Sequence, residues 1–402
     1  MRKPKLRFRG YTDDWEQRKL GSLLNETREK TKVENEDTLL SCAIDGMYLN
    51  SELFSHFRGS SNIGYLKVKK NDLILSAQNL HLGNCNVNLR FEHGIISPAY
   101  KVYEFVDCDP LFMQAWVKQD STKKFFLKAS TEGASVCRKN IVWDELYKQT
   151  LPIPKLKEQE KIGQYFNNLD HLITLHQRKC EGTKKLKKYM LQKMFPKKGM
   201  TVPEIRFDGF TDDWEQRKFS ELVTIERGGS PRPIDKFITN DEKGLNWVKI
   251  GDAPEQGNYI TQTAEKIRPE GLSKTRKVHP GDLILSNSMS FGRPYIMAID
   301  GCIHDGWLAI RDTEKNFDLK FLCTLLGTDG MLNQYKAMAA GSTVNNLNKE
   351  LVGGTTVAFP MMEEQIKIGE YFTNLDHLIT LHQRKCEELQ KLKKFMLQNM
   401  FV

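Results

Sequence analysis

Hydrophobic residues recur at alternating steps of four and three in two long stretches of the chain. This spacing is the heptad seam of a coiled coil, and neither stretch contains proline. We therefore predict one long helix in each stretch. In the first, the apolar or small seam positions are Ile162, Phe166, Leu169, Ile173, His176, Cys180 and Thr183. In the second, with a small phase slip near Leu392, they are Ile368, Phe372, Leu375, Ile379, His382, Cys386, Leu389, Leu392, Met396 and Met400.

The two predicted helices are near-copies of each other. Residues 158–195 and 364–401 are identical at 30 of 38 positions. At about 1.5 Å per residue, each helix would be roughly 57 Å long, which is more than a compact domain needs. We expect their apolar stripes to pack together, antiparallel about a pseudo-twofold axis. The alternative is that each helix packs only into the core of its own domain. Three glycines weaken the helix propensity, namely Gly163, Gly182 and Gly369.

A shorter repeat shows that the whole chain is a tandem duplication. Residues 7–20 return almost unchanged as residues 206–219. Each half therefore consists of this opening motif, a variable segment and a long helix. Thr12 or Asp13 can cap a short helix that would carry Trp15 inward. We interpret the motif as a docking turn rather than a binding site.

The variable segments between the repeated pieces are rich in short β-like runs. Both contain Asp-Leu-Ile-Leu-Ser, at 72–76 and 282–286, which predicts a turn followed by a buried strand. Each segment is predicted to be a mixed α/β globule with a twisted, partly barrel-like sheet. The expected fold is thus α+β, with two such domains joined by two long antiparallel coiled-coil helices. The predicted boundaries are 1–154 and 200–360 for the domains, and 155–199 and 361–402 for the helices. The other predicted strands are 39–44, 95–105, 151–154, 247–250, 307–311 and 357–360.

Composition narrows the class of protein only modestly. The 402 residues carry a net charge of +9, which suits a nucleic-acid partner without requiring one. The eight cysteines are scattered without a Cys-x-x-Cys pair, which indicates a reducing compartment. There is no apolar run of the ~18 residues that a membrane span needs, and no signal peptide is recognisable. We expect a cytoplasmic protein with no membrane partner.

Catalytic motifs are missing from the sequence. No Gly-x-Gly-x-x-Gly follows a predicted strand, and there is neither a P-loop nor the Asn/Asp-Pro-Pro-aromatic tetrapeptide of adenine methyltransferases. We therefore predict that the chain is not an enzyme.

The order of these features, twice over, resembles the specificity subunit of type I restriction-modification systems. The resemblance covers essentially the whole chain and implies two target recognition domains, each reading one half of a split double-stranded DNA site. It further implies that the helices act as a spacer and dock two modification (methyltransferase) subunits, through which restriction and translocase subunits join the complex. S-adenosylmethionine, ATP and Mg²⁺ would be bound by those partner subunits and not by this chain. The stretches that carry the resemblance are 228–233, 247–250, the two Asp-Leu-Ile-Leu-Ser strands, 94–100, 341–344 and the Glu-Gln-x-Lys-Ile before each helix.

DNA reading requires side chains that offer donors and acceptors to base edges, and cations for phosphates. Polar residues at the ends of predicted strands are the candidates, although solvated loops are polar for ordinary reasons too. Because the two segments differ, the implied target is two unlike half-sites. In the first segment the candidates are Ser60, Asn62, Ser76, Gln78 and Asn79, with Lys123 and Lys124 as phosphate cations or an exposed rim. In the second they are Ser230, Arg232, Ser286, Asn287, Arg293, Thr343, Asn345 and Asn346.

The helices raise two further questions. His176, Cys180, His382 and Cys386 form a set that zinc could use, but polar seam residues that fix register are an equally physical account. We predict no metal. Residues 158–198 carry 10 Lys/Arg against 4 acids, whereas residues 364–402 carry 6 against 5. The surplus at the exit of the first helix is either a solvated helical end or a phosphate clamp.

A rival hypothesis is a coiled-coil assembly adaptor whose variable domains bind protein. A steep fall of affinity with salt would favour DNA, since it reports phosphate contacts. Two half-sites read from one face of B-DNA lie about 34 Å apart, a separation that helices of this length could hold.

Overall fold

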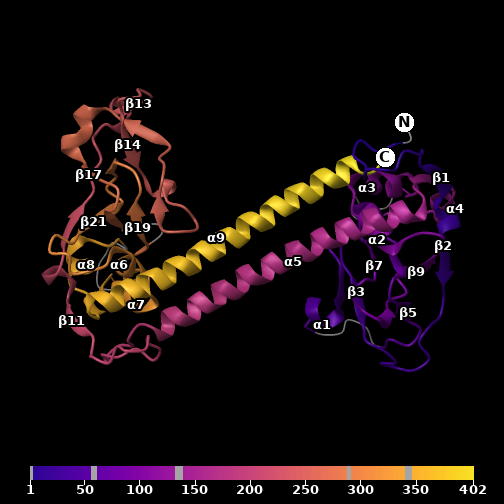
Figure 1. Ribbon diagram of the computed structural model, residues 1–402, viewed down its shortest axis with the longest axis horizontal. Helices are drawn as coiled ribbons and strands as arrows, with labels where there is room; N and C mark the ends of the chain where they lie inside the picture. Colours follow the sequence, from indigo (N-terminus) through magenta and orange to yellow (C-terminus); the bar gives the residue numbers. More distant parts are fainter. Residues whose placement is uncertain (1–2, 56–60, 132–138, 288–290, 340–345) are drawn as a thin grey trace. The chain divides into compact units, whose positions relative to one another are not determined.

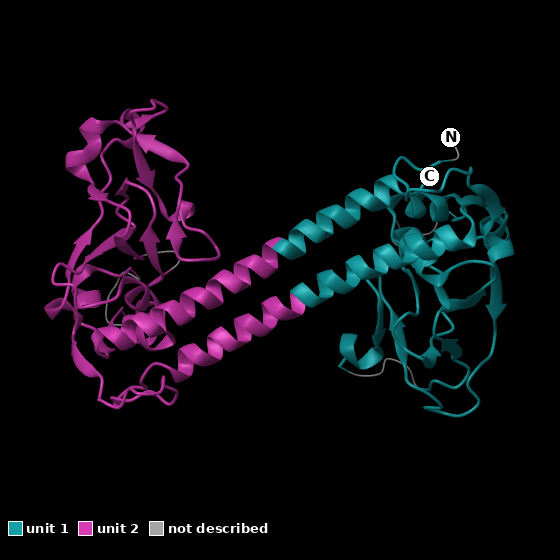
Figure 2. Cartoon of the chain, in the orientation of Figure 1, with its two compact units in different colours: residues 1–176, 385–402 teal, residues 177–384 magenta. Residues whose placement is uncertain are grey.

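The structure, a computed structural model, describes residues 3–55, 61–131, 139–287, 291–339 and 346–402 (Figure 1). The chain divides into two compact units (Figure 2). Unit 1 consists of residues 1–176 and 385–402, and unit 2 of residues 177–384. Each unit therefore contains one globular domain and a part of both long helices. Within the described ranges, no helix combines the length and the apolarity needed to cross a lipid bilayer.

The two long helices are present as predicted. Helix α5 spans Leu156–Lys193 and helix α9 spans Met362–Asn399, with 38 residues each. In unit 2, Lys187 Nζ lies 2.6 Å from a carboxylate oxygen of Asp376, and in unit 1 Lys393 Nζ lies 2.5 Å from Asp170. These two ion pairs occupy matching positions of the repeat. Within each unit, the segments of α5 and α9 run antiparallel.

The apolar stripe of each helix is buried along its first half. Each of the following side chains is at most 8% exposed: Ile162, Phe166, Leu169, Ile173, Ile368, Phe372, Leu375 and Ile379. The prediction for Leu392 was wrong, because this residue is 41% exposed. Beyond the phase slip, Lys393 faces Asp170 and Met396 packs against the core, so Leu392 is turned outward.

Unit 1 is built from short strands and a few short helices. Its largest sheet has the order β2-β9-β6-β7 with antiparallel neighbours, and β3-β4, β5-β8 and β1-β10 form three pairs. Helices α2 and α3 lie next to the long helices, whereas β3 and β5 lie farther out (Figure 1). The elements before α5 are β1 Glu16–Lys19, β2 Leu24–Thr27, β3 Leu40–Cys42, β4 Met47–Leu49, α1 Asn50–Leu53, β5 Leu66–Lys69, β6 Leu73–Ser76, the 3-10 turn η2 Leu80–Leu82, β7 Cys85–Val87, β8 His93–Ile96, β9 Tyr100–Phe105, α2 Pro110–Val117, α3 Asp120–Lys128, α4 Trp143–Lys148 and β10 Thr150–Ile153.

Unit 2 has the same plan with larger sheets. They have the orders β12-β21-β18-β19-β15 and β13-β16-β14-β20-β17, and β11 pairs with β22. In both units the described strands form separate sheets, which differs from the expected partly barrel-like sheet. The elements are β11 Glu215–Lys218, β12 Thr224–Arg227, β13 Ile238–Thr239, β14 Leu245–Val248, β15 Tyr259–Ile260, β16 Glu265–Ile267, β17 Arg276–Val278, β18 Leu283–Ser286, β19 Pro294–Met297, β20 Gly301–Ile303, β21 Trp307–Arg311, α6 Leu319–Leu326, α7 Asp329–Ala339, α8 Lys349–Gly353 and β22 Thr356–Phe359.

The Asp-Leu-Ile-Leu-Ser runs form the buried central strands β6 and β18, as predicted. Each is preceded by a tight turn whose left-handed position holds Asn71 (φ 72°) or Gly281 (φ 92°), residue types that tolerate this conformation. The aspartate then closes the turn. Asp72 Oδ2 accepts a hydrogen bond from Lys69 N at 2.7 Å, and Asp282 Oδ2 accepts one from His279 N at 2.8 Å.

The opening motif buries its tryptophan but does not form the expected short helix. Trp15 and its copy Trp214 are buried, and the residues that follow them form strands β1 and β11. Strand β1 pairs with β10 and β11 with β22, which are the strands that lead into the long helices. Pairing with a strand distant in sequence thus overrides the local capping signal.

The same aromatic junction joins helix and domain in both units. In unit 1, the ring of Phe401 lies 5.4 Å from that of Phe112, 5.8 Å from Phe166 and 6.2 Å from Trp15. In unit 2, Phe195 lies 5.8–5.9 Å from the rings of the three matching residues, which are Phe321, Phe372 and Trp214. We call each set of four rings a docking junction. Each contains the end of one long helix and the beginning of the other.

The Glu-Gln-x-Lys-Ile sequence supplies polar contacts around each junction. The buried Glu158 receives two hydrogen bonds from Arg7, from Nε at 2.6 Å and from Nη2 at 2.7 Å. Arg206 and Glu364 repeat this geometry in unit 2. The Glu-Gln-x-Lys-Ile sequence is therefore explained by its role in docking each domain onto the long helices.

Two of the three helix glycines allow the long helices to lie close to the short helices α2 and α6. A Cβ atom at Gly163 would lie 2.5 Å from Oδ1 of Asp109, which caps helix α2. At Gly369 it would lie 2.5 Å from Oδ1 of Asp318, which caps α6. A Cβ at Gly182, in contrast, would have no neighbour within 4 Å.

Candidate nucleic-acid interface

The most connected polar cluster in unit 2 surrounds Asp305, in the turn between β20 and β21. Its Oδ1 accepts a hydrogen bond from Ser230 Oγ at 2.8 Å and lies 2.9 Å from His304 Nε2. Arg232 Nη2 lies 3.9 Å from the other carboxylate oxygen. The backbone carbonyl of Asp305 accepts from Asn287 Nδ2 at 2.9 Å. We call these five residues the Asp305 cluster.

Glycines bring the separate loops of this cluster together. Gly228 N donates to Trp307 O and Gly229 N to Ile303 O, so the loop after β12 lies against the β20–β21 turn. A Cβ at Gly228 would lie 2.1 Å from the carbonyl oxygen of His304. The Gly-Gly-Ser-Pro sequence thus permits backbone contact that side chains would prevent.

The electrostatics of the cluster favour a carboxylate that orients cations. Burial opposes the ionisation of Asp305, but the hydrogen bond from Ser230 and the nearby charges of His304 and Arg232 outweigh it, and its pKa is lowered. Arg232 itself is largely solvent-exposed, with 73% of its side chain accessible. A planar guanidinium that is held at one edge and open at the other can form paired hydrogen bonds to a base.

The predicted residues of unit 2 fall into three groups. Ser230 and Arg232 belong to the Asp305 cluster and remain accessible, and Asn346 is exposed. Ser286 and Asn287 are buried, so their side chains support the loops instead of lying at the surface. Arg293 is half-buried, donates to the carbonyl oxygens of Glu255 and Gly257, and lies over the ring of Tyr295. Thr343 and Asn345 lie outside the described residues.

In unit 1, two of the predicted residues are buried. Asn62 exchanges hydrogen bonds with Asn35, and Ser76 Oγ accepts from the backbone N–H groups of Gln78 and Asn79. Their polar groups thus hold loops together, which the sequence pattern could not show. Ser60 lies outside the described residues.

The other predicted residues of unit 1 gather at one place. Gln78 is exposed and Asn79 is half-buried, just before η2. Lys123 of α3 lies against the same loop, because a Cβ at Gly83 would be 3.3 Å from its Cε. Lys124 is also exposed. This loop and α3 form the candidate DNA-facing surface of unit 1.

Three residues of the Asp305 region escaped the sequence analysis. Asp305, His304 and Arg227 were not among the predicted site residues, and Arg227 Nε donates to Asp305 O at 3.3 Å. The His-Asp-Gly run between two β-like segments was a turn signal. The sequence contained no hint that the loop after β12 would meet it.

The histidine and cysteine residues of the helices show no metal site. In the part of the chain that the structure describes, no three His, Cys, Asp or Glu side chains are placed to hold a metal ion. Cys180 is buried, with its Sγ 4.0 Å from the carbonyl oxygen of Ile379.

The long helices also expose large apolar residues, and most of these match through the repeat. Leu172, Leu392 and Phe395 are exposed in unit 1, and their equivalents Leu378, Leu186 and Tyr189 are exposed in unit 2. Unit 2 adds Leu381. We call these two sets the helix patches. Apolar surface that recurs in this way is typical of an interaction site.

Comparisons with known proteins agree with this architecture. Residues 211–391 match the family described as type I restriction modification DNA specificity domain. The chain is 24% identical over 406 residues to the type I restriction enzyme MjaVIII specificity subunit of Methanocaldococcus jannaschii, an alignment that covers 95% of this chain and 91% of that protein. It is also 24% identical to the putative MjaX specificity subunit of the same organism, over 85% of this chain and 75% of that protein.

A solved structure shares the fold over the whole length. The S subunit of the type I restriction-modification system from M. genitalium aligns with a TM-score of 0.62 at 13% identity, covering 100% of this chain and 99% of that one. The family match, the full-length relatives and this fold point to one conclusion. In sequence and in fold, the chain is similar to the specificity subunits of type I restriction-modification systems.

Proposed function

We propose that each unit reads one half of a bipartite, asymmetric DNA site, while the helices dock two modification subunits. The similarity to specificity subunits supports DNA sequence recognition. The finer assignment rests on one observation. The two docking junctions repeat residue for residue, whereas the loops that surround the Asp305 cluster have different residues in unit 1.

In this proposal, unit 2 reads its half-site with Arg232, whose guanidinium lies 3.9 Å from Asp305, a carboxylate that Ser230 holds in place. A guanidinium in this position suits the paired acceptors of guanine. Unit 1 offers an amide instead, Gln78, with Lys123 and Lys124 placed for phosphates. Because an amide and a guanidinium present different donor and acceptor patterns, the two half-sites would differ.

The helix patches support two copies of one partner. Their members are equivalent through the repeat, so a protein that binds one patch would find nearly the same surface in the other unit. Modification subunits are the partners expected in such a complex, with restriction and translocase subunits joining through them. S-adenosylmethionine, ATP and Mg²⁺ would then be bound by those partners.

The test is binding-site selection from random duplex DNA with the full chain co-expressed with its modification subunit. We expect enrichment of a split motif with two unlike halves at one fixed spacing. No enrichment from an intact, folded complex would contradict the proposal and favour a protein-binding adaptor.

The role of the helices as a spacer can be tested separately. Inserting or deleting one heptad at matching positions of α5 and α9 should change the preferred gap between the half-sites, while each half-site keeps its own sequence. An unchanged gap would contradict the spacer.

A further inference from the structure

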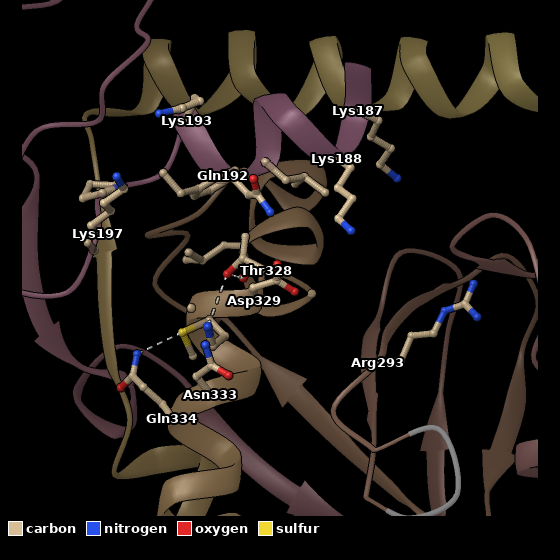
Figure 3. Close-up of a pocket in the computed structure, with 18 of the residues that line it drawn as sticks. Lys187, Lys188, Gln192, Lys193, Lys197, Arg293, Thr328, Asp329, Asn333 and Gln334 are labelled. Carbon is tan, nitrogen blue, oxygen red and sulfur yellow. Dashed lines mark hydrogen bonds between the residues drawn. The ribbon is translucent and has the colours of Figure 1, made fainter. Parts of the chain in front are cut away.

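Unit 2 contains a large basic cleft that the proposed function has not yet used. Its volume is about 1280 Å³, and it lies between the end of α5, the start of α7 and the loop that carries Arg293 (Figure 3). Its cationic lining, which we call the lysine cleft, consists of Lys184, Lys187, Lys188, Lys193, Lys197 and Lys198, together with Arg293. The carboxylates in the lining are Asp329 and Asp376.

Several of these cations are already balanced by carboxylates. Lys187 binds Asp376, and Lys193 and Lys197 share Glu204. Within the described parts of the chain, Lys188 and Lys198 have no ion pair. Figure 3 shows the side chain of Lys188 pointing from α5 into the cleft, with Arg293 on the opposite side. Within the described residues, the lining therefore carries more positive charge than Asp329, Asp376 and Glu204 balance.

Only part of this charge belongs to one half of the repeat, since Lys187 and Lys188 are matched by Lys393 and Lys394 of α9. The positions in α9 that match Lys184 and Lys193 hold Gln390 and Asn399, both uncharged. A partner that binds equally to both halves would not need this difference.

The dimensions suit the backbone of a nucleic acid. The stretch from Lys184 to Lys193 extends about 14 Å along α5, at about 1.5 Å per residue. One strand of duplex DNA carries a phosphate every ~3.4 Å along its axis, so about four phosphates could face it. Arg293 comes from the loop between β18 and β19, next to Ser286 and Asn287.

We infer that the lysine cleft binds the phosphate backbone of duplex DNA beside the half-site read by unit 2, independently of sequence. This inference rests on the proposed function. It adds to the binding free energy a contribution from unit 2 that depends on salt and not on the base sequence.

The decisive variant is Lys188→Gln with Lys198→Gln, which removes the two unpaired cations. The matched control is Lys179→Gln with Lys185→Gln, which removes the same charge from exposed positions of α5 that do not line the cleft. Both variants are purified as the full chain with the modification subunit. Binding to the selected DNA site is then measured between 50 and 200 mM salt.

We expect the cleft variant to lower the slope of log affinity against log salt by about 1.8, since each lost phosphate contact removes about 0.9. The ratio of wild-type to variant affinity should then be roughly tenfold larger at 50 mM than at 200 mM salt. The control should keep most of the wild-type slope. The selected sequence should be the same for all three proteins.

Three results would overturn the inference. An unchanged slope, or an equal change in the control, would show that the cleft does not contact phosphates in particular. Loss of the modification subunit with an unchanged slope would assign the cleft to an acidic protein surface. If the wild-type complex itself selects no DNA, the proposed function fails as well, so the two failures are distinguishable.

Discussion

The two units are alike where they meet the helices and different where their loops face outward. At the docking junctions, Trp15, Phe112, Phe166 and Phe401 have one-to-one partners in unit 2, with nearly the same ring distances. Away from the junctions, the described residues of unit 1 form no equivalent of the Asp305 cluster of unit 2. The repeat thus preserves the residues that attach each domain to the long helices, whereas the outward-facing loops of the two domains differ.

The two units also differ in the charged residues beside their central strands β6 and β18. In unit 2, Asp282 at the start of β18 lies 2.5 Å from Arg311 Nη1. In unit 1 the position that matches Arg311 on the neighbouring strand is Glu104, so Asp72 has no arginine. The turn is the same in both units, but its charge balance is not.

The largest expected effect tests the likeness of the junctions. Phe401→Ala should lower the free energy of unfolding of unit 1 by about 3–5 kcal/mol, and Phe195→Ala should do the same to unit 2, because each leaves a cavity among three rings. Hydrogen exchange, read separately for the two units, measures this. The control Phe395→Ala removes an exposed ring and should leave stability unchanged. If the stability of one unit did not fall when its ring was removed, the two junctions would not be equivalent.

The next effect tests the contrast in charge. Burial raises the pKa of Asp72 to about 6; the hydrogen bond from Lys69 N opposes the shift, and Glu104 adds to it. An unfolded aspartate has a pKa near ~3.9, so the folded state binds this proton more tightly. The free energy of unfolding of unit 1 should therefore fall by roughly 2–3 kcal/mol as the pH rises from about 4 to about 6.

Two variants isolate this contribution from other titrating groups. Asp72→Asn should remove it, and Glu104→Arg, which copies unit 2, should reduce it by lowering the pKa of Asp72. Denaturant unfolding across the same pH range gives the comparison. An unaltered pH dependence in Asp72→Asn would contradict the assignment.

A third prediction concerns the helix glycines. Gly163→Ala should destabilise the docking of unit 1 by about 1–3 kcal/mol, because the new Cβ overlaps Asp109 and Phe112 N. Gly182→Ala has open space and should instead stabilise α5 by up to about 1 kcal/mol. Thermal unfolding of the two variants should therefore shift in opposite directions. Shifts of the same sign would show that Gly163 is not held by close packing.

The smallest effect tests the unlike loops. Arg232→Ala should weaken DNA binding by roughly 1–2 kcal/mol and relax selection at one base pair of the half-site read by unit 2. Gln78→Ala should alter the other half-site only. Binding-site selection with each variant provides the measurement. If either variant changes both halves, the separate-reader proposal is wrong.

The fold was largely predictable, and the reasons are local. The two long helices follow from a period that persists over many turns, and strands β6 and β18 follow from a turn signal before an apolar run. The short helix expected at Trp15 failed because strand β10, more than a hundred residues away, pairs with the residues that follow. The prediction that Leu392 lies on the buried seam failed because a phase slip moves the buried stripe around the helix.

The candidate site was less predictable because burial decides it. Asn62, Ser76, Ser286 and Asn287 are polar loop residues by sequence, yet they are buried. Whether a polar group faces inward depends on partners from distant strands. Asp305 is the opposite case. It was not predicted, because its contacts come from three loops that are distant in sequence and meet only in the folded structure.

The place of Phe401 within unit 1 also has a consequence for biosynthesis. A ribosome releases the chain from its N-terminus, so residues 177–384 emerge before residues 385–402, which complete unit 1. The unit whose synthesis begins first is thus the last to have all its parts. Until then the first domain would present an open aromatic surface, which chaperones recognise and which is prone to aggregate.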